Sequence, residues 1–161
     1  CFDVDGTLTD GRLFFVLYCG ELKAFHVHDG QGLRLLEDAG IAVALITARK
    51  SKIVEKRGED LRLTHIYTGV SNKLTILKTL CKNLDISLSQ VAYMGDDLPD
   101  LACLQSVGLA ACPNDAMIII KQNVHWQSEY LGGCGAARQF CDFIMTSQNL
   151  NHALIARYSA P

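Results

Sequence analysis

The chain has little of what membrane-spanning, nucleic-acid-binding or disulfide-rich proteins need. Its 15 lysines and arginines are outnumbered by 17 aspartates and glutamates, for a net charge of −2, so the basic footprint of a nucleic-acid or anionic-membrane binder is missing. No apolar run reaches the roughly 18 residues that a bilayer-spanning helix needs. The seven cysteines are scattered and form no C-x-x-C pair, which disfavours a zinc or redox site. We therefore expect reduced thiols in a cytoplasmic protein.

What the sequence does contain fits one globular domain. Its 161 residues are 49% hydrophobic and 20% charged, enough for one domain with a buried core. No repeat, low-complexity tract or linker divides the chain, so we expect a single domain over residues 1–161. Only Cys1 and Phe2 precede the first acidic motif, whereas a buried strand usually has about five or six residues. We expect the native N-terminus to lie further upstream.

Short apolar runs alternate with helical stretches, a pattern that predicts an α/β fold with a mainly parallel sheet. Strands are expected at 1–5, 41–46, 65–67, 91–94, 107–111 and 124–126. Helices are expected from a cap at Asp29 to Gly40 and over 51–61, 72–84, 99–106, 115–121 and 136–147. Residues 13–18 and 21–27 flank Cys19-Gly20 and predict a β-hairpin. The tail over 148–161 is expected to be helical or mobile.

Two acidic motifs stand where predicted strands end. Asp3-Val4-Asp5-Gly6-Thr7 closes the first strand, and Gly95-Asp96-Asp97-Leu98-Pro99-Asp100 follows the strand over 91–94. Ligands of α/β sheets gather at the carboxyl ends of the strands, so the two motifs are expected to meet there. Period-two alternation projects Asp3 and Asp5 to the same side, and carboxylate oxygens suit Mg²⁺. Between the motifs, Thr47 follows one strand and Lys73 opens a helix.

A purely structural interpretation competes with this one. The acidic residues could end a strand or cap the helix at Pro99, and Lys73 could be a solvated surface residue. Two carboxylates at the mouth of a buried strand repel each other without a cation, which disfavours that interpretation. For Asp97 and Asp100 both alternatives stay open: helix capping, or orienting Lys73 or a metal-bound water.

The four motifs, in this order, resemble those of the haloacid dehalogenase-like (HAD) hydrolases. The resemblance implies a Rossmann-like three-layer α/β/α fold and assigns roles. Asp3 would be the nucleophile that forms an aspartyl-phosphate, and Asp5 the general acid and base. Thr47 and Lys73 would hold the phosphoryl oxygens. Mg²⁺ would be bound by Asp3, the main-chain carbonyl of Asp5 and Asp96. Response-regulator receiver domains use similar residues, but there the acidic pair comes first and the accepting aspartate later.

The spacing of the motifs leaves no room for a cap domain. Residues 8–46 hold only the hairpin, a helix and a strand, and 22 residues separate Lys73 from Asp96. A capless enzyme needs another cover for its site, and a neighbouring subunit is the simplest one.

A closer resemblance extends over nearly the whole chain apart from its last dozen or so residues. It is to the family of 3-deoxy-D-manno-octulosonate 8-phosphate (KDO 8-phosphate) phosphatases, and it lies in Gly20–Phe25, Asp29-Gly30, Ile46–Lys50, Ser71–Lys73, Val91–Asp97 and Gly132–Ala136. The resemblance implies a Mg²⁺-dependent homotetramer in lipopolysaccharide synthesis, whose hairpin lies against neighbouring subunits. It also implies these substrate-binding residues: His26, Val27, His28, Asp29, Gly30, Arg34, Arg49, Arg57 and Lys73.

Two positions depart from the pattern of that family. At His28 and Cys134 the family commonly carries arginine, so a different sugar-acid phosphate, such as a nonulosonate 9-phosphate, stays an alternative. A non-catalytic assembly domain of a sugar-acid cytidylyltransferase system is another alternative, although intact Asp3 and Asp5 disfavour it. For Arg34 and Arg57, a salt bridge on an exposed helix competes with substrate binding.

Overall fold

The computed structural model describes residues 1–17, 20–150, 156, 158 and 159. Its centre is a parallel sheet, in which β3 (Ala44–Ile46) pairs with β4 (His65–Tyr67), and β6 (Leu109–Cys112) pairs with β5 (Ala92–Met94) and β7 (Trp126–Gln127). Phe2 joins the two halves through bridges to Leu45 and Met94. Its N–H donates to the Ala44 carbonyl at 2.9 Å, and the Asp3 N–H donates to the Met94 carbonyl at 2.9 Å. The N-terminal segment therefore delivers Asp3 to the middle of the sheet.

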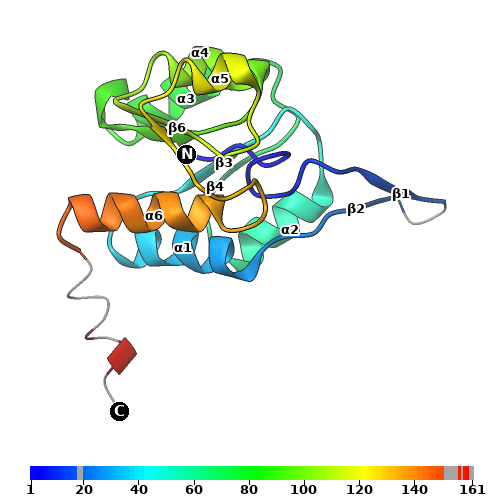
Figure 1. Cartoon of the computed structure of the whole chain (residues 1–161), viewed down its shortest axis with the longest axis horizontal. Coiled ribbons are helices and arrows are strands. Elements are labelled where there is room, and N and C mark those ends of the chain that lie inside the picture. The colour runs from blue at the N-terminus through cyan, green and yellow to red at the C-terminus, as the bar shows by residue number, and fades with distance from the viewer. Residues whose placement is uncertain (18–19, 151–155, 157, 160–161) are drawn as a thin grey trace.

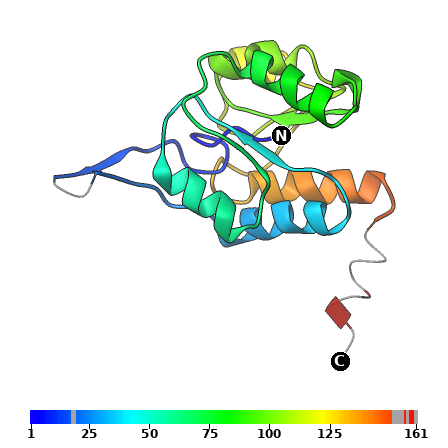
Figure 2. The same ribbon diagram turned by 180° about the vertical axis from the view of Figure 1, so that it is seen from behind.

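Helices cover both faces of this sheet, as Figures 1 and 2 show. One layer contains α1 (Val27–Asp38), α2 (Lys52–Asp60) and α6 (Ala136–Ser147), and the other contains α3 (Lys73–Asn83), α4 (Leu101–Leu104) and α5 (Ile118–Lys121). Each layer has its own apolar core, the first around Phe2, Leu33 and Phe140 and the second around Leu77 and Tyr93. Each such buried side chain contributes roughly 1.5–3 kcal/mol. The predicted three-layer α/β/α fold with a mainly parallel sheet is confirmed.

Several helices form where their sequence patterns place them. In α3, Leu77, Leu80 and Cys81 recur at helical spacing and are buried, while Asn72 caps the helix by accepting a 3.0 Å hydrogen bond from the Thr75 N–H. The α6 helix has the bounds predicted for it. Where a short helix was predicted over 99–106, the 3₁₀ turn η2 (Leu98–Asp100) leads directly into α4. A further 3₁₀ turn, η1 (Leu88–Gln90), precedes β5.

The start of α1 differs from its prediction. The helix begins at Val27, two residues before the cap predicted at Asp29, so Val27 lies on a helix and not on the predicted hairpin strand over 21–27. The cause is His26, whose backbone is extended and whose Nδ1 accepts a 3.3 Å hydrogen bond from the His28 N–H. The side chain of Asp29 turns instead to α6, where it accepts hydrogen bonds from the N–H groups of Gly135 (3.3 Å) and Arg138 (2.8 Å).

Other boundaries shift by a few residues. The hairpin strands β1 (Phe14–Val16) and β2 (Gly20–Leu22) are shorter than predicted, with Phe14 opposite Leu22. The α5 helix starts three residues late because the Asp115 carboxylate accepts a 2.9 Å hydrogen bond from the Gly132 N–H and keeps that segment in a loop. Strands β6 and β7 both start two residues later than predicted. Most of the predicted tail over 148–161 lies outside the described residues.

The hairpin projects from the body of the molecule (Figure 1). It presents apolar side chains to solvent, with Phe15 74% and Leu17 84% exposed. Among the helices that the structure describes, none combines the length and the apolar character needed to cross a bilayer. The cysteines that the structure describes are free, as expected, and they are Cys1, Cys81, Cys103, Cys112, Cys134 and Cys141.

Candidate active site

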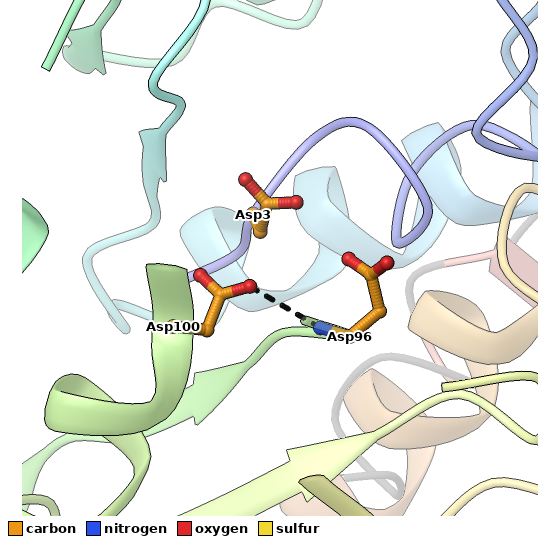
Figure 3. A group of neighbouring side chains, drawn as sticks. All are labelled: Asp3, Asp96 and Asp100. Carbon is orange, nitrogen blue, oxygen red and sulfur yellow. Dashed lines mark hydrogen bonds between the residues drawn. The ribbon is translucent and has the colours of Figure 1, made fainter. Parts of the chain in front are cut away.

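Three carboxylates meet at the carboxyl ends of the central strands (Figure 3). Asp3, Asp96 and Asp100 each offer an oxygen, and these oxygens lie within 4.8 Å of one another. Burial and the charge of Asp100 raise the pKa of Asp3 well above its usual range, and the same two causes raise the pKa of Asp96 to about 6. Anions so close together repel unless a cation lies between them. The oxygen set and its crowding fit a divalent ion such as Mg²⁺.

The loop after Asp3 is shaped to reach Asp96. Gly6 has a φ of +94°, and a Cβ atom there would lie 2.1 Å from Oδ2 of Asp96, so only glycine fits the position. The next residue, Thr7, is fully buried and donates a 3.2 Å hydrogen bond from Oγ1 to Oδ1 of Asp96. Residues 3–7 therefore lie against the second acidic motif, as the strand-end prediction requires.

Lys73 connects the two acidic motifs. Its Nζ lies 2.5 Å from Oδ1 of Asp3 and 2.7 Å from Oδ1 of Asp100, and its side chain is only 5% exposed. Burial lowers the pKa of Lys73, but the charges and hydrogen bonds of the two carboxylates outweigh it and leave the pKa raised. The lysine therefore stays charged in a site where a phosphoryl group would bring further negative charge.

Sequence reasoning missed a tyrosine behind this lysine. Tyr93 on β5 is fully buried and donates a 2.8 Å hydrogen bond from its hydroxyl to Oδ1 of Asp100. Oδ2 of Asp100 accepts longer hydrogen bonds from the N–H groups of Asp96 and Asp97 (3.3 and 3.5 Å). The available signal was a tyrosine in an otherwise apolar buried strand, because a buried hydroxyl needs a partner.

Asp97 and Asp100 differ in which of their two predicted roles the structure supports. Asp97 is exposed and caps η2, accepting a 2.7 Å hydrogen bond from the Leu98 N–H. Asp100 completes the same capping box but also contacts Lys73 and belongs to the carboxylate group. Sequence reasoning had given Asp100 no place among the metal ligands, and it had named the main-chain carbonyl of Asp5 instead.

Thr47 lies where its motif predicts, directly after β3. It is 2% exposed, its N–H donates to the Tyr67 carbonyl at 2.9 Å, and its Oγ1 accepts a 3.2 Å hydrogen bond from the Arg49 N–H. The adjacent strand is the segment that carries Asp3. The Thr47 hydroxyl therefore stands at the same edge of the sheet as the carboxylates.

The carboxylate of Asp5 faces the hairpin side of the site. Its Oδ1 forms an ion pair with Nζ of Lys23, which follows β2, and its Oδ2 lies 3.9 Å from Nε of Arg49. Oδ2 is buried and has no hydrogen-bond partner among the described residues. Lys23 belongs to Gly20–Phe25, one of the segments that carry the resemblance, but neither the motifs nor the resemblance predicts it as a site residue. A lone lysine in a predicted hairpin strand gives no signal of burial.

Four predicted substrate-binding residues lie around one small cavity. His26, Asp29, Gly30 and Arg57 line a cavity of only about 10 Å³, too small for a sugar. The Arg57 guanidinium lies over the Phe25 ring, 5.6 Å from its centroid, and closes the space beside Gly30. The Asp29 carboxylate is engaged with α6. Among the described residues, no hydrogen bond or ion pair joins these side chains to Asp3, Asp96 or Asp100.

The other predicted pocket residues are distributed around the fold. Arg34 donates a 3.0 Å hydrogen bond to the Leu61 carbonyl and lies 3.7 Å from Asp38, the helix salt bridge that was its structural alternative. Val27 is 71% exposed, and the exposed His28 packs edge-on against His26. No side-chain contact ties these three residues to Asp3 in the part of the chain that the structure describes.

The glycine-rich turn lies beside the acidic loop. The Gly133 N–H donates a 3.0 Å hydrogen bond to the Thr7 carbonyl, and a Cβ atom at Gly132 would lie 1.9 Å from the Gly6 carbonyl oxygen. The exposed Cys134 follows in this turn. Cys134, where the family commonly carries arginine, therefore lies near the loop of the first acidic motif.

A larger cavity, of about 310 Å³, lies at the opposite edge of the sheet. Its lining includes Phe2, Ile41, Val91 and Ile144, and no acidic or lysine side chain is among the described residues that line it. A phosphoryl group has no cation or metal site there, so this cavity is not the active site.

The chain is similar to proteins of known activity. The haloacid dehalogenase-like hydrolase family matches residues 62–131. A 3-deoxy-D-manno-octulosonate 8-phosphate phosphatase of Yersinia pestis is 41% identical over 147 residues, which cover 91% of this chain and 79% of that protein.

Two solved structures share the fold closely. The structure of a hypothetical protein of Xanthomonas campestris is 53% identical with a TM-score of 0.96, over 99% of this chain and 87% of that one. The 3-deoxy-D-manno-octulosonate 8-phosphate phosphatase of Moraxella catarrhalis, in complex with magnesium, phosphate and KDO, is 39% identical with a TM-score of 0.95, over 98% and 91%. The chain belongs to the family of 3-deoxy-D-manno-octulosonate 8-phosphate phosphatases, within the haloacid dehalogenase-like hydrolases.

Proposed function

We propose that this protein is a Mg²⁺-dependent phosphatase that hydrolyses KDO 8-phosphate to KDO and phosphate, a step of lipopolysaccharide synthesis. The observation that carries the proposal is the contact of Lys73 with Asp3 inside a group of three carboxylates. This contact supports the proposal because it would put a nucleophile, a cation and a metal site next to one another. The magnesium, phosphate and KDO in the Moraxella catarrhalis relative support the same chemistry.

The first step uses Asp3 and Asp5. A carboxylate oxygen of Asp3 bonds to phosphorus while the bond from phosphorus to the sugar oxygen breaks, and that oxygen takes a proton from Asp5. In the second step Asp5 takes a proton from water, whose oxygen bonds to phosphorus and releases phosphate from Asp3. Both steps need Asp5 to turn from its hairpin-side partners toward the leaving oxygen or the water. The first step also needs Asp5 to be protonated, and the proton that it takes from water in the second step restores this form.

The other residues bind and orient. Lys73 and Thr47 would hold the phosphoryl oxygens, with Lys73 adding positive charge where negative charge spreads in the transition state. Asp3 and Asp96 would hold Mg²⁺ together with the main-chain carbonyl of Asp5, and Asp100 stands beside them. When bound, the ion offsets the repulsion between the carboxylates and the phosphate and polarises the phosphoryl group.

Activity measurement tests this proposal directly. The enzyme with Mg²⁺ is incubated with KDO 8-phosphate, a nonulosonate 9-phosphate and neutral sugar phosphates, and released phosphate is measured. We expect the highest kcat/KM for KDO 8-phosphate. Preference for the nonulosonate 9-phosphate would assign the departures at His28 and Cys134 to a changed substrate. Turnover of no phosphate ester by the metal-loaded enzyme would contradict the phosphatase itself and favour an assembly role.

We further propose a single capless domain that works as a cytoplasmic homotetramer. Support comes from the apolar residues that the hairpin exposes, Leu13, Phe14, Phe15, Val16, Leu17 and Leu22, because monomers rarely expose so continuous an apolar segment. Light scattering on the eluting protein should give four chains. A monomer that is fully active would contradict the need for a neighbouring subunit.

A further inference from the structure

We propose that Asp29 is a positioning residue of the Mg²⁺ site. It caps α6 from α1 and so fixes the glycine-rich turn over 132–135, which in turn holds the loop of the first acidic motif against Asp96. The inference rests on the proposed function, because it concerns the metal of the same reaction. The resemblance predicts a direct contact of Asp29 with the substrate, whereas an action through the turn predicts an effect on Mg²⁺ binding.

Asp29 is a buried carboxylate that pairs with no lysine or arginine side chain among the described residues. It is 2% exposed, and the hydrogen bonds that it accepts come from the main-chain N–H groups of Gly135 (3.3 Å) and Arg138 (2.8 Å). Burial raises the pKa of Asp29, and these two N–H groups lower it only in part. Burying a carboxylate without a cation is costly. Its charge therefore adds little to stability, and its effect is on the segment that it holds.

The start of α6 has no cap of its own. Its N-cap residue is Gly135, which has no side chain, and its first turn contains no acidic residue. The first N–H groups of a helix have no partner within the helix, and the helix dipole favours a negative charge beside them. Asp29 supplies both an acceptor and a charge, across 106 residues of sequence. It can do so because α1 and α6 lie side by side (Figures 1 and 2).

The turn that leads into α6 is held by contacts of its glycine N–H groups. The Gly132 N–H donates a 2.9 Å hydrogen bond to Oδ1 of Asp115, and the Gly133 N–H donates a 3.0 Å hydrogen bond to the Thr7 carbonyl. Asp29 holds the other end of the turn. Asp115 is exposed, so Asp29 is the buried one of the two carboxylates that anchor the turn. Loss of Asp29 would leave the contact with Thr7 less firmly supported.

Thr7 connects the turn to the metal site. Its carbonyl accepts the hydrogen bond from Gly133, and its hydroxyl donates a 3.2 Å hydrogen bond to Oδ1 of Asp96, the proposed Mg²⁺ ligand. Partners that orient a metal ligand commonly account for about 10–100-fold of metal affinity. Asp29 acts through further contacts, so its share should be smaller. It should nevertheless be measurable as weaker Mg²⁺ binding.

The test compares Mg²⁺ binding by the wild type and by Asp29→Asn, using calorimetric titration. Asparagine keeps the size of the side chain but turns an NH₂ group toward one of the two N–H donors, so one hydrogen bond is lost. We expect the Kd for Mg²⁺ to rise by roughly 3–10-fold. The KM for KDO 8-phosphate at saturating Mg²⁺ should change by less than about twofold. Asp142→Asn removes a charge from the surface of the same helix and is the matched control, with wild-type Mg²⁺ binding.

A double-mutant cycle tests the route through Thr7. Thr7→Val lacks the hydroxyl that donates to Asp96, so Asp29→Asn should weaken Mg²⁺ binding less in this background than in the wild type. Calorimetric titration of the two single variants and the double variant measures this coupling. An equal effect of Asp29→Asn in both backgrounds would overturn the route.

Two other results would overturn the inference. A higher KM with unchanged Mg²⁺ affinity would show that Asp29 binds the substrate, and a lower Tm with unchanged Mg²⁺ affinity would limit Asp29 to stability. If Asp29→Asn does not fold, Asp29→Ser replaces it with the same expectation. Mg²⁺ binding needs no turnover, so failure of the wild type with every phosphate ester would contradict the proposed function and not this inference.

Discussion

Nζ of Lys73 lies 2.5 Å from Oδ1 of Asp3, across 70 residues of sequence. Lys73 is the first residue of α3, where the helix dipole disfavours a positive charge. Two buried carboxylates, Asp3 and Asp100, compensate for this position. The contact therefore places a fixed cation beside the proposed nucleophile at some cost to the helix, which is expected of a site selected for chemistry and not for stability.

Replacing this lysine should remove activity. We expect Lys73→Met to lower kcat by about 10²–10³-fold, because the developing phosphoryl charge loses its fixed cation. Steady-state kinetics at saturating Mg²⁺ measures the effect. Lys78→Met, on the same helix and exposed, should keep the wild-type rate. A Lys73→Met enzyme with near wild-type kcat would contradict the assigned role.

Tyr93 should act through Asp100. In Tyr93→Phe the ring and its packing remain, but Asp100 loses the 2.8 Å hydrogen bond. We expect a stability loss of about 1 kcal/mol and a several-fold lower kcat with a smaller change in KM, because Asp100 orients Lys73. Urea unfolding and steady-state kinetics report the two effects. Tyr67→Phe, at the partly buried Tyr67 of β4, is the control. Unchanged kcat in Tyr93→Phe would limit Tyr93 to a packing role.

Gly6 should not tolerate a side chain. Gly6→Ala combines a φ of +94° with a Cβ atom 2.1 Å from Asp96, so we expect a loss of about 1–3 kcal/mol in stability and a marked loss of Mg²⁺ affinity. Gly40→Ala isolates the backbone contribution, because Gly40 has a φ of +82° with nothing within 4 Å of its Cβ position. Calorimetric titration with Mg²⁺ compares the two. Equal behaviour of both variants would argue against the close approach of Gly6 to Asp96.

The carboxylate cluster should make the metal-free protein sensitive to pH. In the folded state the pKa of Asp96 is raised from 3.8 to about 6, so the folded protein binds this proton more tightly than the unfolded chain does. The resulting stability is fully present below about pH 4 and is lost as pH rises through about 6, by an amount on the order of 1 kcal/mol or more. The raised pKa of Asp3 acts in the same direction.

Thermal unfolding with and without Mg²⁺, at pH 5 and pH 7.5, measures this effect. We expect Mg²⁺ to raise Tm more at pH 7.5, and Asp96→Asn to raise the Tm of the metal-free protein there. Asp142→Asn, on the surface of α6, is the control. It should not raise the Tm of the metal-free protein, and Mg²⁺ should stabilise it as it stabilises the wild type. A metal-free Asp96→Asn protein that is less stable than the wild type at pH 7.5 would contradict the repulsion within the cluster.

Local sequence patterns were sufficient for most of the fold. Apolar runs and helical spacing placed α3 and α6 nearly to the residue, and strand ends predicted that Asp3 and Asp96 meet. The predicted start of α1 was wrong because His26, and not Asp29, caps the helix. A neutral imidazole nitrogen can accept a hydrogen bond as a cap does, but this depends on its surroundings and leaves no pattern in the sequence.

The parts of the site that were missed depend on long-range contacts. Lys23 contacts Asp5 and Tyr93 contacts Asp100, and neither contact follows from period or motif. The structure likewise turns the Asp29 carboxylate toward α6 and Arg34 toward Leu61. A resemblance to a family predicts which residue types occupy the positions of its motifs. It does not predict which neighbour each side chain contacts in this chain.

Covalent phosphorylation of Asp3 is the most direct test of the proposed reaction. The enzyme is mixed with Mg²⁺ and KDO 8-phosphate under single-turnover conditions and quenched in acid, and its peptides are mapped by mass spectrometry. We expect one phosphoryl group on the peptide that contains Asp3, absent in Asp3→Asn, whose kcat should fall more than ~10²-fold. A phosphoryl group on another residue, or wild-type turnover by Asp3→Asn, would contradict Asp3 as the nucleophile.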